Sequence, residues 1–351
     1  MKSIIKTIVL CAGISSLALQ SCTNKAIEDK NTKYVMVIHG GAGTIEKQHM
    51  TEEKEKAYVA ALTEALQMGH KLLQEGKSAL DAVQAAVNVL EDSPLFNAGK
   101  GAVFTNEGKN ELDASIMDGQ TLKAGAVAGV TNIKNPINAA RAVMEQSEHV
   151  MMVGRGAELF AAAHGCDTVP PSYFFTQERW DQLQRTIQKE SNGRNAYHEP
   201  DPRQQQIYGL TAKDAKFGTV GAVALDQQGN LAAATSTGGM TNKRYGRVGD
   251  SPILGAGTYC NNNTAGISCT GWGEYFIRAT AASRVSALME LKNLSVSDAA
   301  KQVIEEIERL GGDGGIIALD KNGNVAMEFN TSGMYRGTVD ENGKISVHIY
   351  K

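Results

Sequence analysis

One motif occurs twice in this chain, and its repetition restricts the folds that the sequence can adopt. The pattern Ala-Leu-Asp-x-x-Gly-Asn-x-Ala covers residues 224–232 and again residues 318–326. In each copy a turn of the type Asp-x-x-Gly-Asn joins two apolar runs, which is typical of a β-hairpin. Helices are expected around both copies. Two hairpins flanked by helices predict stacked sheets covered by helices, in an α+β fold.

Apolar periodicity and capping residues predict the other elements. A buried strand is expected over residues 34–38, followed by a glycine-rich loop over residues 39–43. Helices are expected over residues 52–75, after a capping box of Ser78 and Asp81, after the N-cap pair Asn135-Pro136, and over residues 274–291 and 297–310, with short strands over residues 126–130 and 150–153.

A long polar segment ends at Gly218-Thr219. Residues 176–217 are interpreted as a mobile linker, and an apolar strand, 219–225, begins directly after them. Thr219 fits an ordinary β-branched residue at a domain boundary. It also fits a nucleophile, because cleavage before Thr219 would place a free α-amine, with a reference pKa of ~7.7–8, beside a hydroxyl. One residue would then hold both base and nucleophile.

Three polar clusters downstream bear on that choice. The first contains Thr237, at the end of the partner strand of the same hairpin, where its hydroxyl would return beside Thr219. A cross-strand threonine pair without chemistry is the alternative. The second cluster holds Arg247 and Asp250 on a glycine-flanked loop. Arginine suits a bidentate grip on a carboxylate and aspartate accepts from an ammonium, so the pair would read both ends of an α-amino acid, unless it forms a salt bridge within the loop.

The third cluster is Thr270-Gly271, just before an expected helix. A hydroxyl and a backbone N–H at the N-terminus of a helix are the donors that an oxyanion hole needs. An N-cap formed by Thr270 is the simpler alternative.

Four ordered motifs together resemble the plant-type L-asparaginase/isoaspartyl peptidase family of N-terminal-nucleophile (Ntn) hydrolases. They are Gly-Thr-Val-Gly-Ala at 218–222, Ser-Thr-Gly-Gly-Met at 236–240, Gly-Arg-Val-Gly-Asp-Ser-Pro at 246–252 and Thr-Gly-x-Gly-Glu at 270–274. The resemblance runs from Val35 to Gly337. It implies a four-layer αββα sandwich that cuts itself between Gly218 and Thr219, giving an α subunit of residues 34–218 and a β subunit of residues 219–351.

The resemblance also implies the chemistry. Thr219 would attack the side-chain carbonyl of L-asparagine or of a β-aspartyl (isoaspartyl) dipeptide and release L-aspartate. Thr237 would orient the nucleophile, and Thr270 with the Gly271 N–H would stabilise the oxyanion.

Binding and assembly follow from the same resemblance. Arg247 would bind the α-carboxylate of the substrate and Asp250 its α-amine, with help from Gly273. No catalytic cofactor is required. The loop from Leu90 to Lys100 corresponds to a family segment that holds a structural sodium ion through backbone carbonyls. Family members usually assemble as a dimer of αβ units.

Residues 1–21 have the pattern of an export signal. Lys2 and Lys6 precede a mostly apolar run that is too short to be a comfortable membrane span. The run ends in Leu-Gln-Ser-Cys, which resembles a bacterial lipobox with Cys22 as the lipidated residue, and residues 22–33 would form a tether. Thr23 after the cysteine favours the periplasmic face of the outer membrane. Plain secretion to the periplasm is the alternative.

Charge and cysteine usage exclude some classes of partner. The net charge of −3 with no basic run argues against nucleic acid. Cys166, Cys260 and Cys269 lack the spacing of a metal site, and Cys260 and Cys269 are interpreted as buried thiols rather than as a disulfide.

Two other functions compete with the hydrolase. A glycosylasparaginase, acting on N-glycosylated asparagine, shares the threonine nucleophile and the loop 246–252, although residues 39–43 and 218–222 favour the peptidase branch. A non-catalytic, lipid-anchored amino-acid-binding protein would use Arg247 and Asp250 without chemistry.

Overall fold

The computed structural model describes residues 33–191 and 218–351, and within these residues the strands form two sheets. The larger sheet has the strand order β12-β11-β1-β5-β6-β2-β3-β4, and the smaller has the order β10-β9-β8-β7. The strands are β1 (Val35–Gly43), β2 (Leu112–Asp118), β3 (Ala124–Val130), β4 (Met151–Val153), β5 (Val220–Leu225), β6 (Leu231–Thr237), β7 (Thr258–Cys260), β8 (Ala265–Gly271), β9 (Gly314–Asp320), β10 (Val325–Phe329), β11 (Gly333–Val339) and β12 (Ile345–Tyr350).

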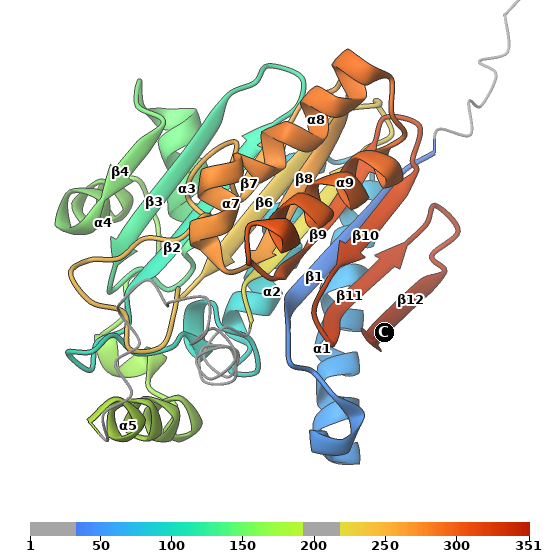
Figure 1. The fold of residues 1–351 in the computed structure, drawn as a ribbon. Helices are drawn as coiled ribbons and strands as arrows, with labels where there is room; N and C mark the ends of the chain where they lie inside the picture. The colour runs from blue at the N-terminus through green and yellow to red at the C-terminus, as the bar shows by residue number, and fades with distance from the viewer. Residues whose placement is uncertain (1–32, 192–217) are drawn as a thin grey trace, which may run out of the picture. The chain divides into compact units, whose positions relative to one another are not determined.

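Helices cover the outer face of each sheet. Helices α8 and α9 lie over the smaller sheet, while α1 and α2 lie on the opposite side, against the larger sheet (Figure 1). The helices are α1 (Glu52–Gln74), α2 (Ala79–Asp92), α3 (Pro136–Gln146), α4 (Gly154–Ala163), α5 (Gln177–Ser191), α7 (Gly273–Ala279), α8 (Ala281–Lys292) and α9 (Val296–Arg309).

Three apolar clusters join these layers. Strand β1 shows why its sequence is apolar throughout: Ile38 packs toward the helices of the larger sheet, and Val37 packs toward the smaller sheet. Val223 and Ile317 join the same inter-sheet cluster, and Ile307 lies in the cluster between the smaller sheet and its helices. Burying one such side chain contributes roughly 1.5–3 kcal/mol. The predicted four-layer αββα sandwich is confirmed.

The two predicted hairpins are β5–β6 and β9–β10, one in each sheet. In both turns the aspartate Oδ1 accepts two backbone N–H groups: Asp226 from residues 228 and 230, and Asp320 from residues 322 and 324. The other oxygens differ in use. Asp226 Oδ2 accepts from the Ala79 N–H at the start of α2, whereas Asp320 Oδ2 accepts from the Asn324 side chain. Among the described residues, the turn aspartate therefore bonds to a helix in the first copy and not in the second.

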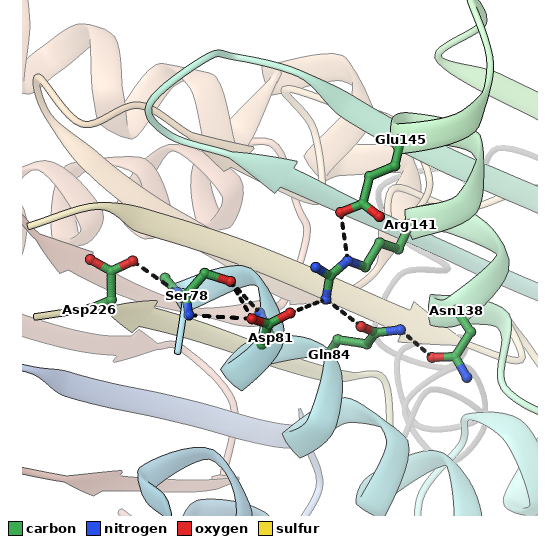
Figure 2. Close-up of polar contacts among 8 residues, drawn as sticks. Ser78, Asp81, Gln84, Asn138, Arg141, Glu145 and Asp226 are labelled. Carbon is green, nitrogen blue, oxygen red and sulfur yellow. Dashed lines mark hydrogen bonds and ion pairs between the residues drawn. The ribbon is translucent and has the colours of Figure 1, made fainter. Parts of the chain in front are cut away.

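Polar contacts at the N-terminus of α2 connect that helix to α3 (Figure 2). Ser78 and Asp81 form the predicted capping box, and Asp81 makes an ion pair of 2.7 Å with Arg141. Arg141 also binds Glu145 at 2.8 Å. Burial raises the pKa of Asp81, but hydrogen bonds from Ser78 and Arg141 outweigh it, so that the pKa lies below its ordinary value.

Two regions differ from the expectation: a helix replaces part of the expected linker, and one expected helix is divided in two. Residues 177–191 form helix α5 instead of the first part of a linker. The sequence hides this helix because Leu183 is its one fully buried apolar residue, while Trp180 packs edge-on against Phe104 at the margin. The helix expected over residues 274–291 is two helices, α7 and α8, because Thr280 adopts a left-handed conformation with φ 47°.

Two local expectations are also corrected. The glycine-rich residues 39–43 continue strand β1, with a register shift between His39 and Gly41, rather than forming a loop. Asn135 is the N-cap residue of α3, but its side chain donates to Asp92 instead of capping. The buried Glu91 carboxylate accepts from the Ile137 N–H in its place.

The capping box yields a stability prediction. Replacing Ser78 by Ala leaves the Asp81 N–H without its acceptor, and we expect the free energy of unfolding to fall by about 1 kcal/mol in urea denaturation. Thr63→Ala is the control, because that hydroxyl donates to the Val59 carbonyl inside α1 and alanine is the better helix former. Equal losses in both variants would contradict a capping role.

Candidate active site

Thr219 is half-buried and immediately precedes β5. Gly218 before it has φ +112°, in the left-handed region that favours glycine. A β-carbon on Gly41 would lie 2.5 Å from the Gly218 nitrogen, and one on Gly218 would overlap the Asn97 nitrogen. The backbone segments around Gly41, Asn97 and Gly218 therefore meet at the Gly218–Thr219 bond, and the two glycines permit this close approach.

The hydroxyls of Thr219 and Thr237 lie 3.0 Å apart, as the hairpin geometry predicts. Val220 pairs with Ser236 in the β5–β6 ladder, which brings the residues just outside the pair together. Thr237 Oγ1 also accepts from the Gly239 N–H at 3.1 Å. The Thr237 hydroxyl is thus fixed from one side and can orient the Thr219 hydroxyl from the other.

Asn97 is a site residue that residue-type reasoning did not assign. Its backbone N–H donates to the Gly218 carbonyl at 2.8 Å, and its own carbonyl accepts from the Gly238 N–H at 2.9 Å. The Asn97 side chain is buried and bonds the Val103 N–H and the Gly239 carbonyl. A donor on the Gly218 carbonyl is aimed at the oxygen that gains charge if that bond is attacked.

Arg247 does not pair with Asp250 in a loop salt bridge. Its Nε and Nη2 bind the two carboxylate oxygens of Glu274, both at 2.9 Å. This side-on pair uses one edge of the guanidinium and leaves the Nη1 edge for a second carboxylate. Glu274, which the sequence interpretation left without a role, orients the guanidinium.

Asp250 is buried, and its Oδ2 has no hydrogen-bond partner among the described residues. Burial raises the pKa of Asp250 to about 7, against the lowering effect of its hydrogen bond and of Arg247. A β-carbon on Gly273 would lie 2.8 Å from Asp250 Oδ1 and 3.0 Å from Arg247 Nη2. The three residues therefore converge, and an unpaired buried carboxyl is suited to receive an ammonium.

Thr270 Oγ1 is also buried without a hydrogen-bond partner among the described residues. It does not cap α7, whose N-cap residue is Trp272, so the capping alternative is wrong. Gly271 has φ +147°, and a β-carbon there would overlap the Asp313 carbonyl. The Thr270 hydroxyl is thus available to a ligand. The backbone beside it has a conformation and a close contact that require glycine at position 271.

Other sequence-based expectations concern thiols, metals and membranes. Cys260 and Cys269 are free, buried thiols, and burial raises both pKa values. No cluster of His, Cys, Asp and Glu suited to a metal occurs in residues 33–191 and 218–351, and none of the helices described there is long and apolar enough to span a membrane. Cys22, the export signal and the later part of the predicted linker lie outside the described residues.

The αββα sandwich with a threonine at the start of an inner strand defines an Ntn-hydrolase fold. A profile of the family described as Asparaginase matches residues 32–349, so the chain belongs to that family. It is 53% identical to the isoaspartyl peptidase of Escherichia coli K12, over 87% of this chain and 92% of that protein.

More distant relatives carry related names. The chain is 49% identical to a putative isoaspartyl peptidase/L-asparaginase of Dictyostelium discoideum, over 92% of this chain and 100% of that protein. It is 43% identical to a plant-type L-asparaginase of Pyrococcus abyssi, over 85% and 94%. The protein is therefore an enzyme of the amidohydrolase type.

The raised pKa of Asp250 predicts a pH-dependent stability. The folded chain holds this proton more tightly than the unfolded chain, whose value is near 3.8, so the contribution is full below pH 3.8 and lost as the pH rises through about 7. We expect Asp250→Asn to reduce the fall in unfolding free energy between about pH 4 and pH 7.5. Urea denaturation checks this, with the exposed Glu305→Gln as the control. Parallel curves for wild type and Asp250→Asn would contradict it.

Proposed function

We propose that this enzyme is an autoprocessing threonine hydrolase that cleaves the side-chain amide of L-asparagine and of β-aspartyl dipeptides and releases L-aspartate. Relatives named isoaspartyl peptidase and L-asparaginase support the substrate class. The Thr219/Thr237 hydroxyl pair beside the Gly218 junction carries the proposal. A non-catalytic binding protein is not supported, because these relatives are named as enzymes.

Processing would begin at the Gly218 carbonyl carbon. The Thr219 hydroxyl attacks it while the Asn97 N–H binds the developing oxyanion. The C–N bond breaks, the nitrogen takes a proton, and the Gly218 acyl group is left on Thr219 Oγ1 as an ester. Water then hydrolyses the ester to give a Gly218 carboxylate and a free Thr219 α-amine.

In the mature enzyme the Thr219 hydroxyl would attack the side-chain carbonyl of the substrate. The α-amine takes the hydroxyl proton and gives it to the departing ammonia or amine, and water then hydrolyses the acyl ester. The Thr270 hydroxyl and the Gly271 N–H stabilise the oxyanion formed in the attack on the substrate and the one formed in hydrolysis of the acyl ester. Arg247, on its unused edge, binds the α-carboxylate, and Asp250 with Gly273 binds the α-ammonium.

Backbone carbonyl oxygens pack closely against glycines in and beside the segment from Leu90 to Lys100. β-Carbons on Gly99 and Gly101 would overlap the carbonyl oxygens of Glu91 and Phe96, and Pro94 O would lie 2.7 Å from the latter β-carbon. Carbonyl oxygens suit a hard cation, and we include in the proposal a structural sodium ion held by backbone carbonyls of this segment. A dimer of αβ units, and export with lipidation at Cys22 to the outer membrane, are further parts of the proposal.

Self-cleavage has a direct test. Intact mass spectrometry of the purified wild type is expected to show two fragments, one of them residues 219–351, whereas Thr219→Ala stays one chain because it lacks the nucleophile. Thr219→Ser keeps a hydroxyl and serves as the matched control, with slower cleavage expected. An uncut wild-type chain after prolonged incubation would sink the mechanism.

Removing the proposed oxyanion donor tests the chemical step. Thr270→Val keeps the side-chain shape, and we expect kcat for L-asparagine to fall by roughly 10²–10³-fold with little change in KM. Steady-state assays of cleaved protein with L-asparagine, β-aspartyl-leucine and an N-glycosylated asparagine measure this and the substrate preference together. A larger change in KM than in kcat would place Thr270 in ground-state binding instead.

A further inference from the structure

A row of polar residues crosses the apolar interface between the two sheets. His39, Gly221, Thr235 and Ser115 are register partners on the adjacent strands β1, β5, β6 and β2, and they share the face that meets the smaller sheet. The side chains of His39, Thr235 and Ser115 are completely buried. Polar groups in such a place lose hydration without adding apolar contact, so their role is not explained by stability alone.

The smaller sheet supplies the partners of this row. Ser268 on β8 and Thr258 on β7 are themselves register partners and completely buried. A β-carbon on Gly221 would overlap both Ser268 Oγ and His39 Nε2. The missing side chain at Gly221 therefore makes the space in which the Ser268 hydroxyl bridges His39 Nε2, at 2.8 Å, and Thr235 Oγ1, at 2.7 Å.

The hydrogen-bonded chain ends on two backbone carbonyls. At one end His39 Nδ1 lies 3.0 Å from the Thr219 carbonyl oxygen. At the other end, Thr258 Oγ1 lies 2.6 Å from Thr235 Oγ1 and 2.8 Å from Ser115 Oγ. Ser115 Oγ in turn lies 2.6 Å from the Ser251 carbonyl oxygen, to which it donates. This series of hydrogen bonds thus connects the main chain of Thr219, the proposed nucleophile, to Ser251, the residue next to Asp250.

The direction of these hydrogen bonds follows from the chemistry of their ends. A carbonyl only accepts, so Nδ1 of His39 carries the proton and Nε2 accepts from Ser268. Burial lowers the pKa of His39 to about 3, although the bond to the Thr219 carbonyl opposes this, so the ring is neutral at ordinary pH. Ser268 then accepts from Thr235, Thr235 from Thr258, and Thr258 from Ser115. Ser115 has a single proton, which it shares between Thr258 Oγ1 and the Ser251 carbonyl oxygen, so the order of donors is consistent from Ser115 to the Thr219 carbonyl.

We propose that His39 is a positioning residue, and that together with the hydroxyls of Ser268, Thr235, Thr258 and Ser115 it fixes the Thr219 main chain relative to the Asp250 loop. The inference rests on the proposed function. Its physical reason is geometric: the nucleophile and the group that holds the substrate ammonium belong to different loops, and an error of about 1 Å in their relative position costs up to about 10²-fold in rate.

The test deletes single hydroxyls with little change of shape. In cleaved Ser268→Ala and Thr235→Val, we expect kcat for L-asparagine to fall by roughly 10- to 100-fold, with KM changing much less. The matched control is the buried Thr264/Ser286 hydroxyl pair, 2.6 Å apart and outside this chain of bonds. Ser286→Ala and Thr264→Val are expected to lower Tm by a similar amount and to keep the wild-type kcat.

His39 itself is tested by a conservative exchange and by coupling. His39→Gln keeps a donor and an acceptor and should retain more of kcat than His39→Ala. In a double-mutant cycle, Ser268→Ala should cost much less in the His39→Ala background than in the wild type, because the two act through one chain. Thr258→Val, farther along that chain, tests the proposal without touching His39.

The outcomes separate this inference from the proposed function. An uncleaved, inactive wild type would defeat the proposed function, whatever the variants do. An active wild type with Ser268→Ala and Thr235→Val as fast as Ser286→Ala would overturn the positioning role. A Ser268→Ala protein that melts like the control yet does not cleave would support it, because the misplaced Thr219 main chain adjoins the bond to be cut.

Discussion

Close packing of three main-chain segments around Gly218 determines the position of the proposed nucleophile, Thr219. The Asn97 N–H donates to the Gly218 carbonyl, the Gly238 N–H donates to the Asn97 carbonyl, and a β-carbon on Gly41 would lie 2.5 Å from the Gly218 nitrogen. These contacts involve backbone atoms, so no change of side-chain rotamer relaxes them. The backbone of the sheet therefore sets the position of Thr219. The fold holds the Gly218–Thr219 bond on a rigid scaffold.

The proposed substrate clamp is built on an asymmetry between its two charged groups. Arg247 is already held by Glu274 through two hydrogen bonds, so its free edge needs little reorganisation when a carboxylate binds. Asp250 Oδ2 is buried without a hydrogen-bond partner among the described residues, so the carboxyl bears the cost of desolvation. An ammonium that neutralises Asp250 removes that cost, which favours an α-amino acid over a ligand with a carboxylate alone.

Sequence reasoning found the candidate site residues that lie in recognisable motifs and gave no role to Asn97, which acts through its backbone. The hairpin turn fixed the distance between Thr219 and Thr237, and the motifs identified Arg247, Asp250 and Thr270. Asn97 acts through its N–H, which every residue but proline carries, so no side-chain pattern marks it. Likewise, Thr280 gives no sign of the left-handed conformation that separates α7 from α8.

The duplicated hairpin explains how one fold assembles both halves of the proposed chemistry. In the first copy the residue before the strand is Thr219, the proposed nucleophile. In the second it is Asp313, whose carbonyl accepts from the Trp272 N–H at 2.9 Å and lies against Gly271. Gly271 pairs with Gly314 at the start of β9, so the second copy shapes the backbone of the proposed oxyanion donors. Because the two copies lie in sheets that pack face to face, the first hairpin carries the proposed nucleophile, and the second pairs with β8, the strand that carries the proposed oxyanion donors.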